Sequence, residues 1–233
     1  MIDARRVFIT GGTGYIGSRL IPELHGHGCE VIALVREQSR ANLPSPCTPV
    51  IGDALSGDSY QKFAEGANTF VHLVGVSHPS PAKTKQFREI DLRAGLEAIR
   101  VAREVDIQHF VYMSVAQPAP VMQNYQAVRA ECERAIASSG LAATVLRPWY
   151  VLGPGHRWPY CLLPFYKLAE LIPQTRDTAL RLGLVTIRQM VQALIHAVNQ
   201  PSEGIRVIEV LDIRRLGKTA SRRRERASGT LNQ

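Results

Sequence analysis

The clearest chemical signal in the sequence is a glycine-rich turn between positions 10 and 17. It reads Thr10-Gly11-Gly12-Thr13-Gly14-Tyr15-Ile16-Gly17 and follows the short apolar run Val7–Ile9. Glycines at this spacing let a strand turn sharply into a helix whose first N–H groups can bind an anion, and the missing side chains leave room for a pyrophosphate. Although glycines also serve turns for conformational reasons alone, the position of this turn between a strand and a helical pattern favours a dinucleotide site. The residues that we expect to form this site are Gly11, Thr13, Gly14, Tyr15, Ile16 and Gly17.

A second polar signal follows the next apolar run, Val31–Val35. In a dinucleotide-binding fold, an acidic residue at this point binds the 2′-hydroxyl of the adenosine ribose, whereas an arginine pairs with a 2′-phosphate. Arg36 takes this place, although Glu37 could still turn inward. We therefore favour NADP(H) over NAD(H) as the cofactor. The alternative is that Arg36 is only a solvated strand end.

Apolar runs alternate with helical periodicity along the chain, and this alternation indicates the fold class. Runs that are apolar on both faces, such as Val31–Val35, are typical of a parallel sheet that is covered on both sides. The clearest helical pattern extends from about Lys83 to Val105. Strands and helices in this order predict an α/β protein with a doubly wound parallel sheet, the Rossmann fold.

The domain organisation follows from length and composition. A chain of 233 residues suits one α/β domain, which we place at residues 1–212. Residues of about 155–200 are too few for a separate domain, and we expect them to form a small C-terminal cap on the substrate side, over the carboxyl ends of the strands. Residues 213–233 are predicted to be a basic, flexible C-terminal tail.

Charge and composition exclude several function classes. Hydrophobic residues make up 45% of the chain, which excludes wholesale disorder. The longest uncharged run, Ile107–Val128, contains two prolines and several amides, so we expect no membrane span. The formal net charge is +8, but residues 213–233 hold seven basic residues and one acidic residue, so the body is nearly neutral and no nucleic-acid partner is predicted. Weak adhesion through the tail is the alternative.

The four cysteines and seven histidines are scattered and predict no metal site. The N-terminal region has no hydrophobic stretch of signal-peptide length, so we expect a cytoplasmic protein.

Four segments together resemble the short-chain dehydrogenase/reductase superfamily. They are the glycine-rich turn, the run VHLVG at 71–75, Tyr125-x-x-x-Arg129, and Leu146-Arg147-Pro148 through Gly153-Pro154. The likeness covers about residues 5–212 and is to the extended and atypical branches, which are NAD-dependent epimerase/dehydratase-like or NAD(P)H-binding proteins. It implies further residues along the cofactor: Asp53 and Ala54 near the adenine, Leu73, Val74 and Gly75 along its length, and Pro148 near the nicotinamide.

The same resemblance implies three catalytic residues. Members of the superfamily carry a serine, a tyrosine and a lysine four residues after the tyrosine, which places the last two on one helix face. Ser114 and Tyr125 match the first two, but Arg129 stands where lysine is expected. Arginine keeps the positive charge, yet it is bulkier and does not deprotonate. The alternative is that Tyr125 is a half-exposed helix residue and Arg129 a surface charge paired with Glu133.

The resemblance thus implies an NAD(P)-dependent oxidoreductase or epimerase-like enzyme. It would transfer hydride to or from a carbonyl or secondary alcohol of a small-molecule substrate, with Tyr125 as general acid/base, Ser114 bound to the substrate oxygen, and Arg129 orienting ribose and tyrosine. The alternative is a non-catalytic NAD(P)H-binding sensor, regulator or assembly factor. The helical face from Lys83 to Val105 is a candidate homodimer surface.

Overall fold

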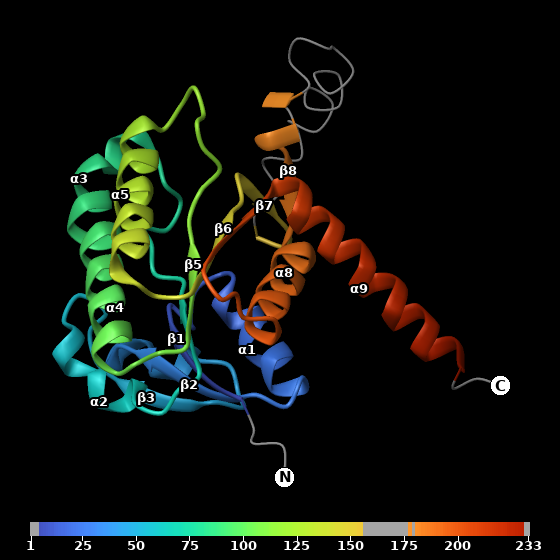
Figure 1. The fold of residues 1–233 in the computed structure, drawn as a ribbon, viewed down its shortest axis with the longest axis horizontal. Helices are drawn as coiled ribbons and strands as arrows, with labels where there is room; N and C mark the ends of the chain where they lie inside the picture. The colour runs from blue at the N-terminus through green and yellow to red at the C-terminus, as the bar shows by residue number, and fades with distance from the viewer. Residues whose placement is uncertain (1–4, 156–176, 179, 231–233) are drawn as a thin grey trace.

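A seven-stranded parallel sheet forms the centre of the molecule (Figure 1). The computed structural model describes residues 5–155, 177–178 and 180–230, with side chains as far as residue 220. In the sheet the strand order is β3-β2-β1-β4-β5-β6-β9. The strands are β1 (Arg6–Thr10), β2 (Glu30–Val35), β3 (Thr48–Ile51), β4 (Thr69–His72), β5 (His109–Met113), β6 (Ala143–Arg147) and β9 (Ile205–Glu209). This arrangement confirms the predicted doubly wound parallel sheet.

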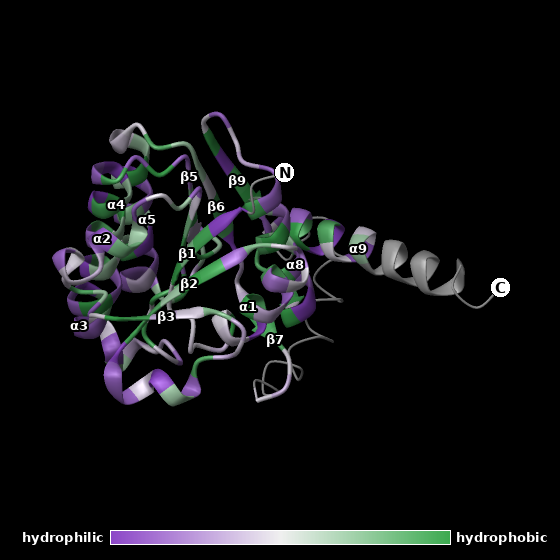
Figure 2. Ribbon diagram, turned by 90° about the horizontal axis from the view of Figure 1, so that it is seen from below, coloured by the Kyte–Doolittle hydropathy of each residue, from purple (hydrophilic) through white to green (hydrophobic). Residues whose placement is uncertain are grey.

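Helices cover both faces of the sheet (Figure 1). On one face lie α1 (Gly17–Gly26), α8 (Ile187–Asn199) and the start of α9 (Val210–Thr230). On the other lie α2 (Gln61–Ala64), α4 (Arg93–Glu104) and α5 (Gln123–Ser139). Figure 2 shows hydrophobic strands enclosed by helices whose outer sides are hydrophilic. None of the described helices combines the length and the hydrophobicity that crossing a bilayer requires.

The two faces of the sheet carry separate hydrophobic cores. On the α1 and α8 side, buried aliphatic residues such as Leu20 and Leu194 pack on the sheet. On the α4 and α5 side the core is aromatic, since Phe70 contacts Phe8 and Phe110 with ring centroids 5.1 and 5.5 Å apart. Alternate residues of each strand feed the two cores, which explains why the strand segments are apolar throughout.

The strand register brings the carboxyl ends of the central strands to one edge of the sheet. Thr10 of β1 pairs with Leu34 of β2 and with His72 of β4, and His72 pairs with Tyr112 of β5. The loops that follow these strands therefore emerge side by side. Open α/β sheets bind ligands at this edge.

The segment predicted as one helix from Lys83 to Val105 is divided in the structure. It runs through the 3₁₀ turn η3 (Pro81–Lys83), the single turn α3 (Thr84–Gln86), the π-helical turn η4 (Phe87–Leu92), and then α4. Phe87, Asp91 and Leu92 of η4 are all buried. A π-helical turn widens the helix locally and changes which residues face the core. Here it carries an acidic side chain inward.

The expected cap and tail fall in the C-terminal part of the chain. Residues 156–176 of the expected cap lie outside the described residues. β7 (Tyr150–Leu152) and β8 (Leu184–Thr186) form a two-stranded sheet, and α8 packs beside α1. Residues 210–230 form helix α9, which projects from the body (Figures 1 and 2). Its first turns are anchored, because Ile213 is fully buried and Arg214 Nε donates to the Leu184 carbonyl at 3.0 Å.

Candidate functional site

The glycine-rich turn connects β1 to α1 and is packed too closely for larger residues. Gly11 has φ of +80°, and a Cβ there would lie 2.8 Å from the Leu73 carbonyl carbon. A Cβ at Gly17 would lie 2.4 Å from the Gly11 carbonyl oxygen. Gly14 is exposed, and its N–H donates to the Gly11 oxygen at 3.0 Å. The turn therefore presents bare backbone at the N-terminus of α1, as anion binding requires.

A cavity of about 500 Å³, here called the strand-end cavity, opens at this turn. It brings together nine of the residues predicted for the cofactor: Gly11, Thr13, Gly14, Arg36, Asp53, Ala54, Leu73, Val74 and Gly75. Its lining does not include Tyr15, Ile16, Gly17 or Pro148. Cavities of this size hold small molecules and cofactors. The strand-end cavity is thus the part of the described structure where the predicted cofactor residues converge.

Sequence reasoning did not single out the far wall of the strand-end cavity. This wall includes Ser77, Lys83, Gln86 and Ile90, which follow β4. Lys83 Nζ donates to the Ser77 carbonyl oxygen at 2.5 Å, so it fixes the loop that leaves β4. These residues were missed because the segment reads as an ordinary amphipathic helix. They could have been found from their position in the segment that leaves the carboxyl end of β4.

Arg36 lies at the mouth of the strand-end cavity. It is exposed at the end of β2, and within the described residues its guanidinium has no hydrogen-bond or ion-pair partner. Asp53, by contrast, is partly used in its own turn, since its Oδ1 accepts from the Leu55 N–H at 3.0 Å. Ser59 Oγ lies 2.9 Å from the Asp53 nitrogen and accepts its N–H. The free cation at this rim is therefore Arg36.

Arg129 is buried behind the cavity wall, with an exposed fraction of 3%. Its Nη2 donates to Asp91 Oδ1 at 2.5 Å, and its Nη1 donates to the Met113 carbonyl at 2.9 Å and to the Tyr112 hydroxyl at 3.3 Å. Burial lowers the pKa of Arg129, but Tyr125, Tyr112 and Asp91 more than reverse this and hold the pKa above its ordinary value. The guanidinium is therefore charged and its donors are largely taken.

Tyr125 lies in the first turn of α5 and contacts Arg129, as the four-residue spacing predicts. The Arg129 guanidinium carbon is 5.1 Å from the centre of the Tyr125 ring, within the range of a cation–π contact. The other neighbour of the ring is Phe87, with centroids 5.0 Å apart. Tyr125 is half-buried and lines a separate cavity of about 380 Å³, here called the tyrosine cavity.

Ser114 follows β5 and is engaged with a different residue. Its hydroxyl donates to the carboxylate of Glu133, which also accepts from Gln117 Nε2 at 2.9 Å and from Arg147 Nη2 at 2.5 Å. The alternative pairing of Arg129 with Glu133 is not formed, because Arg129 pairs with Asp91 and Glu133 pairs with Arg147. In the described part of the chain, Ser114 shares no hydrogen bond with Tyr125 or Arg129.

Two buried histidines lie in the strands beneath the site. His72 Nδ1 contacts Thr10 Oγ1 at 2.8 Å, and its ring stacks on Tyr112 with centroids 5.9 Å apart. Burial, with a smaller effect of Arg129, lowers the pKa of His72 to about 3. His109 Nε2 contacts Thr144 Oγ1 at 2.9 Å, and burial lowers its pKa to about 4. Both rings are therefore neutral near pH 7 and serve packing.

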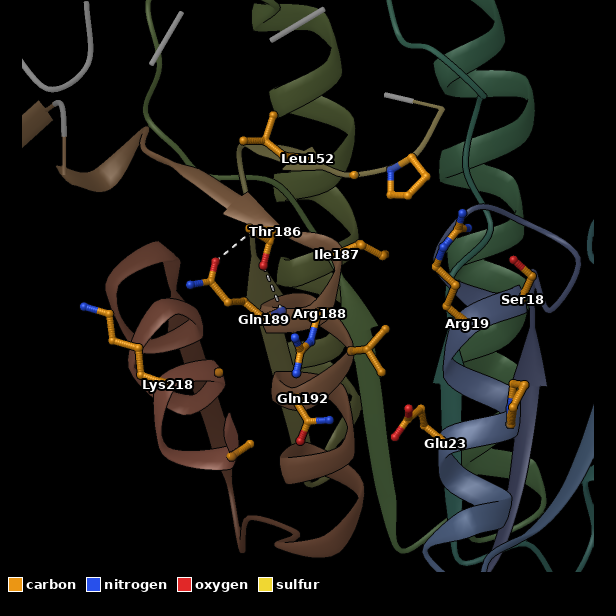
Figure 3. A pocket seen from close by; sticks show the side chains of 16 residues that line it. Ser18, Arg19, Glu23, Leu152, Thr186, Ile187, Arg188, Gln189, Gln192 and Lys218 are labelled. Atoms are coloured by element: carbon orange, nitrogen blue, oxygen red, sulfur yellow. Dashed lines mark hydrogen bonds between the residues drawn. The ribbon is translucent and has the colours of Figure 1, made fainter. Parts of the chain in front are cut away.

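A larger groove of about 1080 Å³ lies along α1, α8 and α9 and shares no lining residue with the strand-end cavity. Figure 3 shows Ser18, Arg19 and Glu23 of α1 on one side, Lys218 of α9 on the other, and α8 between them. The N-terminus of α8 is closed by a capping box in which Thr186 and Gln189 bond reciprocally. This groove contains none of the residues predicted for catalysis or cofactor binding.

Comparison with known proteins gives a consistent picture. The sequence model of the NAD dependent epimerase/dehydratase family matches residues 7–210. The chain is 26% identical over 228 residues to a ceramide reductase of Caulobacter vibrioides, which covers 93% of this chain and 68% of the relative. It is 24% identical over 170 residues to a 4-hydroxy-2-methyl-3-oxo-4-farnesyl-3,4-dihydroquinoline-1-oxide ketoreductase of Stigmatella aurantiaca, covering 64% of this chain and 51% of the relative.

A third relative, a 3-diazoavenalumate denitrifying reductase of Streptomyces, is 32% identical over 176 residues, which is 64% of this chain and 57% of the relative. The chain thus spans between about half and two thirds of the length of these curated relatives.

Solved structures share the fold. The Bordetella bronchiseptica enzyme WbmH in complex with NAD+ superposes with a TM-score of 0.66 at 20% identity, covering 87% of this chain and 74% of that one. DesIV of Streptomyces venezuelae, a dTDP-glucose 4,6-dehydratase with NAD and TYD bound, superposes with a TM-score of 0.66 at 20% identity. The superposition covers 87% of this chain and 75% of that one. These likenesses concern the fold alone.

Proposed function

Because this chain belongs to the NAD dependent epimerase/dehydratase family, we propose that it is a nicotinamide-dinucleotide-dependent oxidoreductase that interconverts a carbonyl and a secondary alcohol. The observation that carries the proposal is the strand-end cavity, where the bare backbone of the glycine turn and the loops after β2, β3 and β4 converge. The cradle fits the group, since added Cβ atoms at Gly11 and Gly17 would collide with neighbouring backbone. The bound cofactor would supply or accept the hydride.

The residues of the cavity divide the task of holding a dinucleotide. The N–H groups of Tyr15 and Ile16, which follow Gly14 at the start of α1, would bind the pyrophosphate. Asp53 and Ala54 would lie along the adenosine half, and Leu73 to Gly75 along the middle of the molecule. Arg36 is a free cation at the rim, and a 2′-phosphate is the group that such an arginine pairs with. We therefore propose NADP(H) as the preferred form.

The proton that accompanies the hydride would pass through Tyr125. Its ring is held between Phe87 and Arg129 at the mouth of the tyrosine cavity. The phenolic hydroxyl is the group that would exchange a proton with a substrate oxygen. Ser114 would bind the same oxygen. Its own proton is directed to Glu133, so it offers lone pairs to the hydroxyl of an alcohol.

We propose that the tyrosine cavity receives a substrate with an apolar body next to its carbonyl. Its lining includes Pro81, Phe87, Pro120, Val121 and Met122, and the Val121 side chain is 54% exposed. Two relatives bear the names of a ceramide reductase and a ketoreductase of a farnesyl-bearing compound. The lining also includes Thr84, Gln123 and Asn124, so its apolar side chains could bury hydrocarbon of the substrate while these polar side chains offer it hydrogen bonds.

The proposal is tested with the purified protein in two steps. NADPH and NADH are titrated while nicotinamide fluorescence is recorded, and turnover is then measured on methyl ketones of increasing chain length. We expect saturable binding and a kcat/KM that rises with chain length. Tyr125→Phe should abolish turnover and leave the NADPH Kd within a few-fold. Tyr60→Phe is the control, since it removes a phenolic hydroxyl that is buried in the core and lines neither cavity. Failure to bind either dinucleotide, or full turnover in Tyr125→Phe, would defeat the proposal.

One observation favours a second candidate function, a non-catalytic NAD(P)H sensor. Arg129 gives its Nη donors to Asp91, Met113 and Tyr112, so it is a poor substitute for a free lysine amine that relays protons. A sensor would bind NADPH and show no turnover, either in the natural protein or in Arg129→Lys. An enzyme would retain turnover in Arg129→Lys, because that variant restores the amine of the superfamily.

A further inference from the structure

We propose that Asp91 is a positioning residue of the nucleotide site, whose single carboxylate fixes both the loop that lines the strand-end cavity and the arginine on the tyrosine-bearing helix. This inference rests on the proposed function of that cavity. Asp91 belongs to none of the motifs that mark the superfamily in this sequence. Its part in the site comes only from its position in the π-helical turn η4.

The two oxygens of the Asp91 carboxylate have two different partners. Oδ1 accepts from Arg129 Nη2 at 2.5 Å, and Oδ2 accepts from the Val76 backbone N–H at 3.0 Å. Val76 lines the strand-end cavity, and Arg129 lies one turn along α5 from Tyr125. Asp91 has no exposed surface, so these contacts are not exchanged with water. One side chain therefore joins the cavity wall to the helix that carries the proton donor.

Gly75 shows how close this pair lies to the cavity. A Cβ on Gly75 would be 2.4 Å from Arg129 Nη2 and 3.1 Å from Asp91 Oδ1. Gly75 itself lines the cavity. The Asp91–Arg129 pair thus forms the layer directly behind the wall, and a ligand in the cavity is separated from it by a single backbone segment. A shift of either side chain changes the shape of the wall.

The partners of Arg129 indicate that its own role is positional too. Its Nη atoms are bound to Asp91, Met113 and Tyr112, and its Nε is buried with no partner within the described residues. A guanidinium held in this way does not reach ribose hydroxyls unless it leaves these partners. It instead links η4 to the end of β5 and lies against the Tyr125 ring.

The buried charges make the pair sensitive to the loss of one partner. A buried ion pair contributes little net stability, but removal of one member leaves an uncompensated charge in a dry environment. In Asp91→Asn the Arg129 guanidinium would keep its charge and seek another acceptor or water. The nearest space is the strand-end cavity behind Gly75. The expected consequence is a distorted wall, and not merely a less stable core.

The test separates positioning from simple stabilisation. The Kd of NADPH is measured by fluorescence titration well below the melting temperature, so that all variants are folded during the measurement. Asp91→Asn should raise the Kd at least tenfold and speed amide hydrogen exchange in the peptide that contains Val76. The matched control is Glu131→Gln, which breaks the exposed Arg88–Glu131 pair between the same two elements, η4 and α5. It should change the Kd less than twofold.

A double variant provides the rescue. Asp91→Asn combined with Arg129→Gln removes the lone buried charge, and the two amides can bond to each other. We expect the Kd to return to within about threefold of the natural value, with exchange at Val76 slowed again. Should Asp91→Asn fail to fold, Asp91→Glu keeps the charge pair but displaces the wall by one methylene. That variant should raise the Kd with little loss of melting temperature.

The outcomes distinguish this proposal from the proposed function. If the natural protein binds neither NADPH nor NADH, both are overturned. If it binds NADPH and folded Asp91→Asn binds with a Kd within twofold of it, only the positioning role of Asp91 is overturned. If Asp91→Asn does not fold and Asp91→Glu is measured in its place, an unchanged Kd in Asp91→Glu likewise overturns the positioning role of Asp91. A raised Kd with no rescue in the double variant would also overturn the role assigned to charge compensation.

Discussion

The hydroxyl of Ser114 donates its proton to the carboxylate of Glu133, so only the lone pairs of this buried hydroxyl are left to accept a hydrogen bond. Glu133 is itself held by Arg147, which also bonds to Glu209 at 2.9 Å. A carboxylate fixed in this way cannot rotate to release the serine proton without breaking its ion pair. In the proposed mechanism Ser114 would therefore accept, and not donate, the hydrogen bond of an alcohol substrate.

Replacement of Ser114 tests this orientation. Ser114→Ala removes the acceptor for the substrate hydroxyl, and we expect kcat/KM for alcohol oxidation to fall by about tenfold to a hundredfold. The NADPH Kd should not change, because Ser114 does not line the strand-end cavity. Steady-state kinetics in both directions provide the measurement. An undiminished kcat/KM in Ser114→Ala would contradict the role assigned to Ser114.

Substitution at the glycine turn should abolish nucleotide binding. Gly14 is exposed, and the side chain in Gly14→Val would stand in the place of the pyrophosphate. Calorimetric titration with NADPH should show no saturation, while the circular dichroism spectrum stays that of a folded protein. Gly26→Val is the matched control, since a Cβ there meets nothing within 4 Å. Unchanged affinity in folded Gly14→Val would show that the turn is only structural.

Arg36 should determine the choice between the two dinucleotides. In Arg36→Ala a charge-assisted contact with the 2′-phosphate would be lost, so NADPH should bind about tenfold or more weaker while NADH is little affected. Arg40→Ala is the matched control, because Arg40 is also exposed but does not line the cavity. Parallel titrations with NADPH and NADH give the ratio of the two Kd values for each variant. An equal loss for NADPH and NADH would refute the preference.

The buried histidines predict how stability depends on pH. The folded-state pKa values of about 3 for His72 and about 4 for His109 lie below the unfolded value near 6.5. Below pH 6.5 the unfolded chain binds protons that the folded chain does not, so stability is complete above that pH and falls as the pH drops toward 4. The loss is roughly 1.4 kcal/mol per histidine and pH unit. Urea unfolding at pH 7, 6 and 5 should show it, and His109→Gln should reduce the slope. If the free energy of unfolding of that variant depends on pH as steeply as in the natural protein, His109 does not contribute to the pH dependence.

The C-terminal helix should contribute to stability through its first turns only. Ile213 is fully buried beside α8, and Gly217 lies so close that a Cβ would be 2.5 Å from Gln189 Cγ. Deletion of residues 213–233 should lower the melting temperature by about 5–10 °C, as loss of a buried isoleucine contact costs about 3 kcal/mol. Deletion of residues 221–233 is the control and should change it by less than about 2 °C. If the chain without residues 213–233 melts at the same temperature as the full chain, α9 adds nothing to the stability of the fold.

The fold could be predicted from the sequence because its signals are local. Runs such as Val31–Val35 are apolar on both faces, and only a covered parallel sheet accommodates them. The strand-end cavity was largely predicted as well, since loops that leave parallel strands meet at one edge. Tyr125 and Arg129 were expected to touch because their spacing is that of a helix face.

Other parts could not be predicted because they depend on distant partners. Asp91 looks like an exposed acid in a helical pattern, and its partner Arg129 lies 38 residues along the chain. The same holds for Ser114, whose partner Glu133 depends on Arg147 of another strand. The basic composition of residues 213–233 predicts a flexible tail, and it gives no sign of the buried positions of Ile213 and Gly217. Pairings of this kind are properties of the packed molecule and leave no periodic signal.

The order of the strands also bears on how the protein emerges from the ribosome. Every residue that lines the strand-end cavity lies between positions 11 and 90, and the strands that carry it, β3-β2-β1-β4, are neighbours in the sheet. Chains fold from the N-terminal end during synthesis where contacts allow. This half of the sheet can therefore assemble before Tyr125 and Arg129 have been added. The Asp91–Arg129 ion pair, together with the pairing of β4 with β5, then joins the later half to the earlier one.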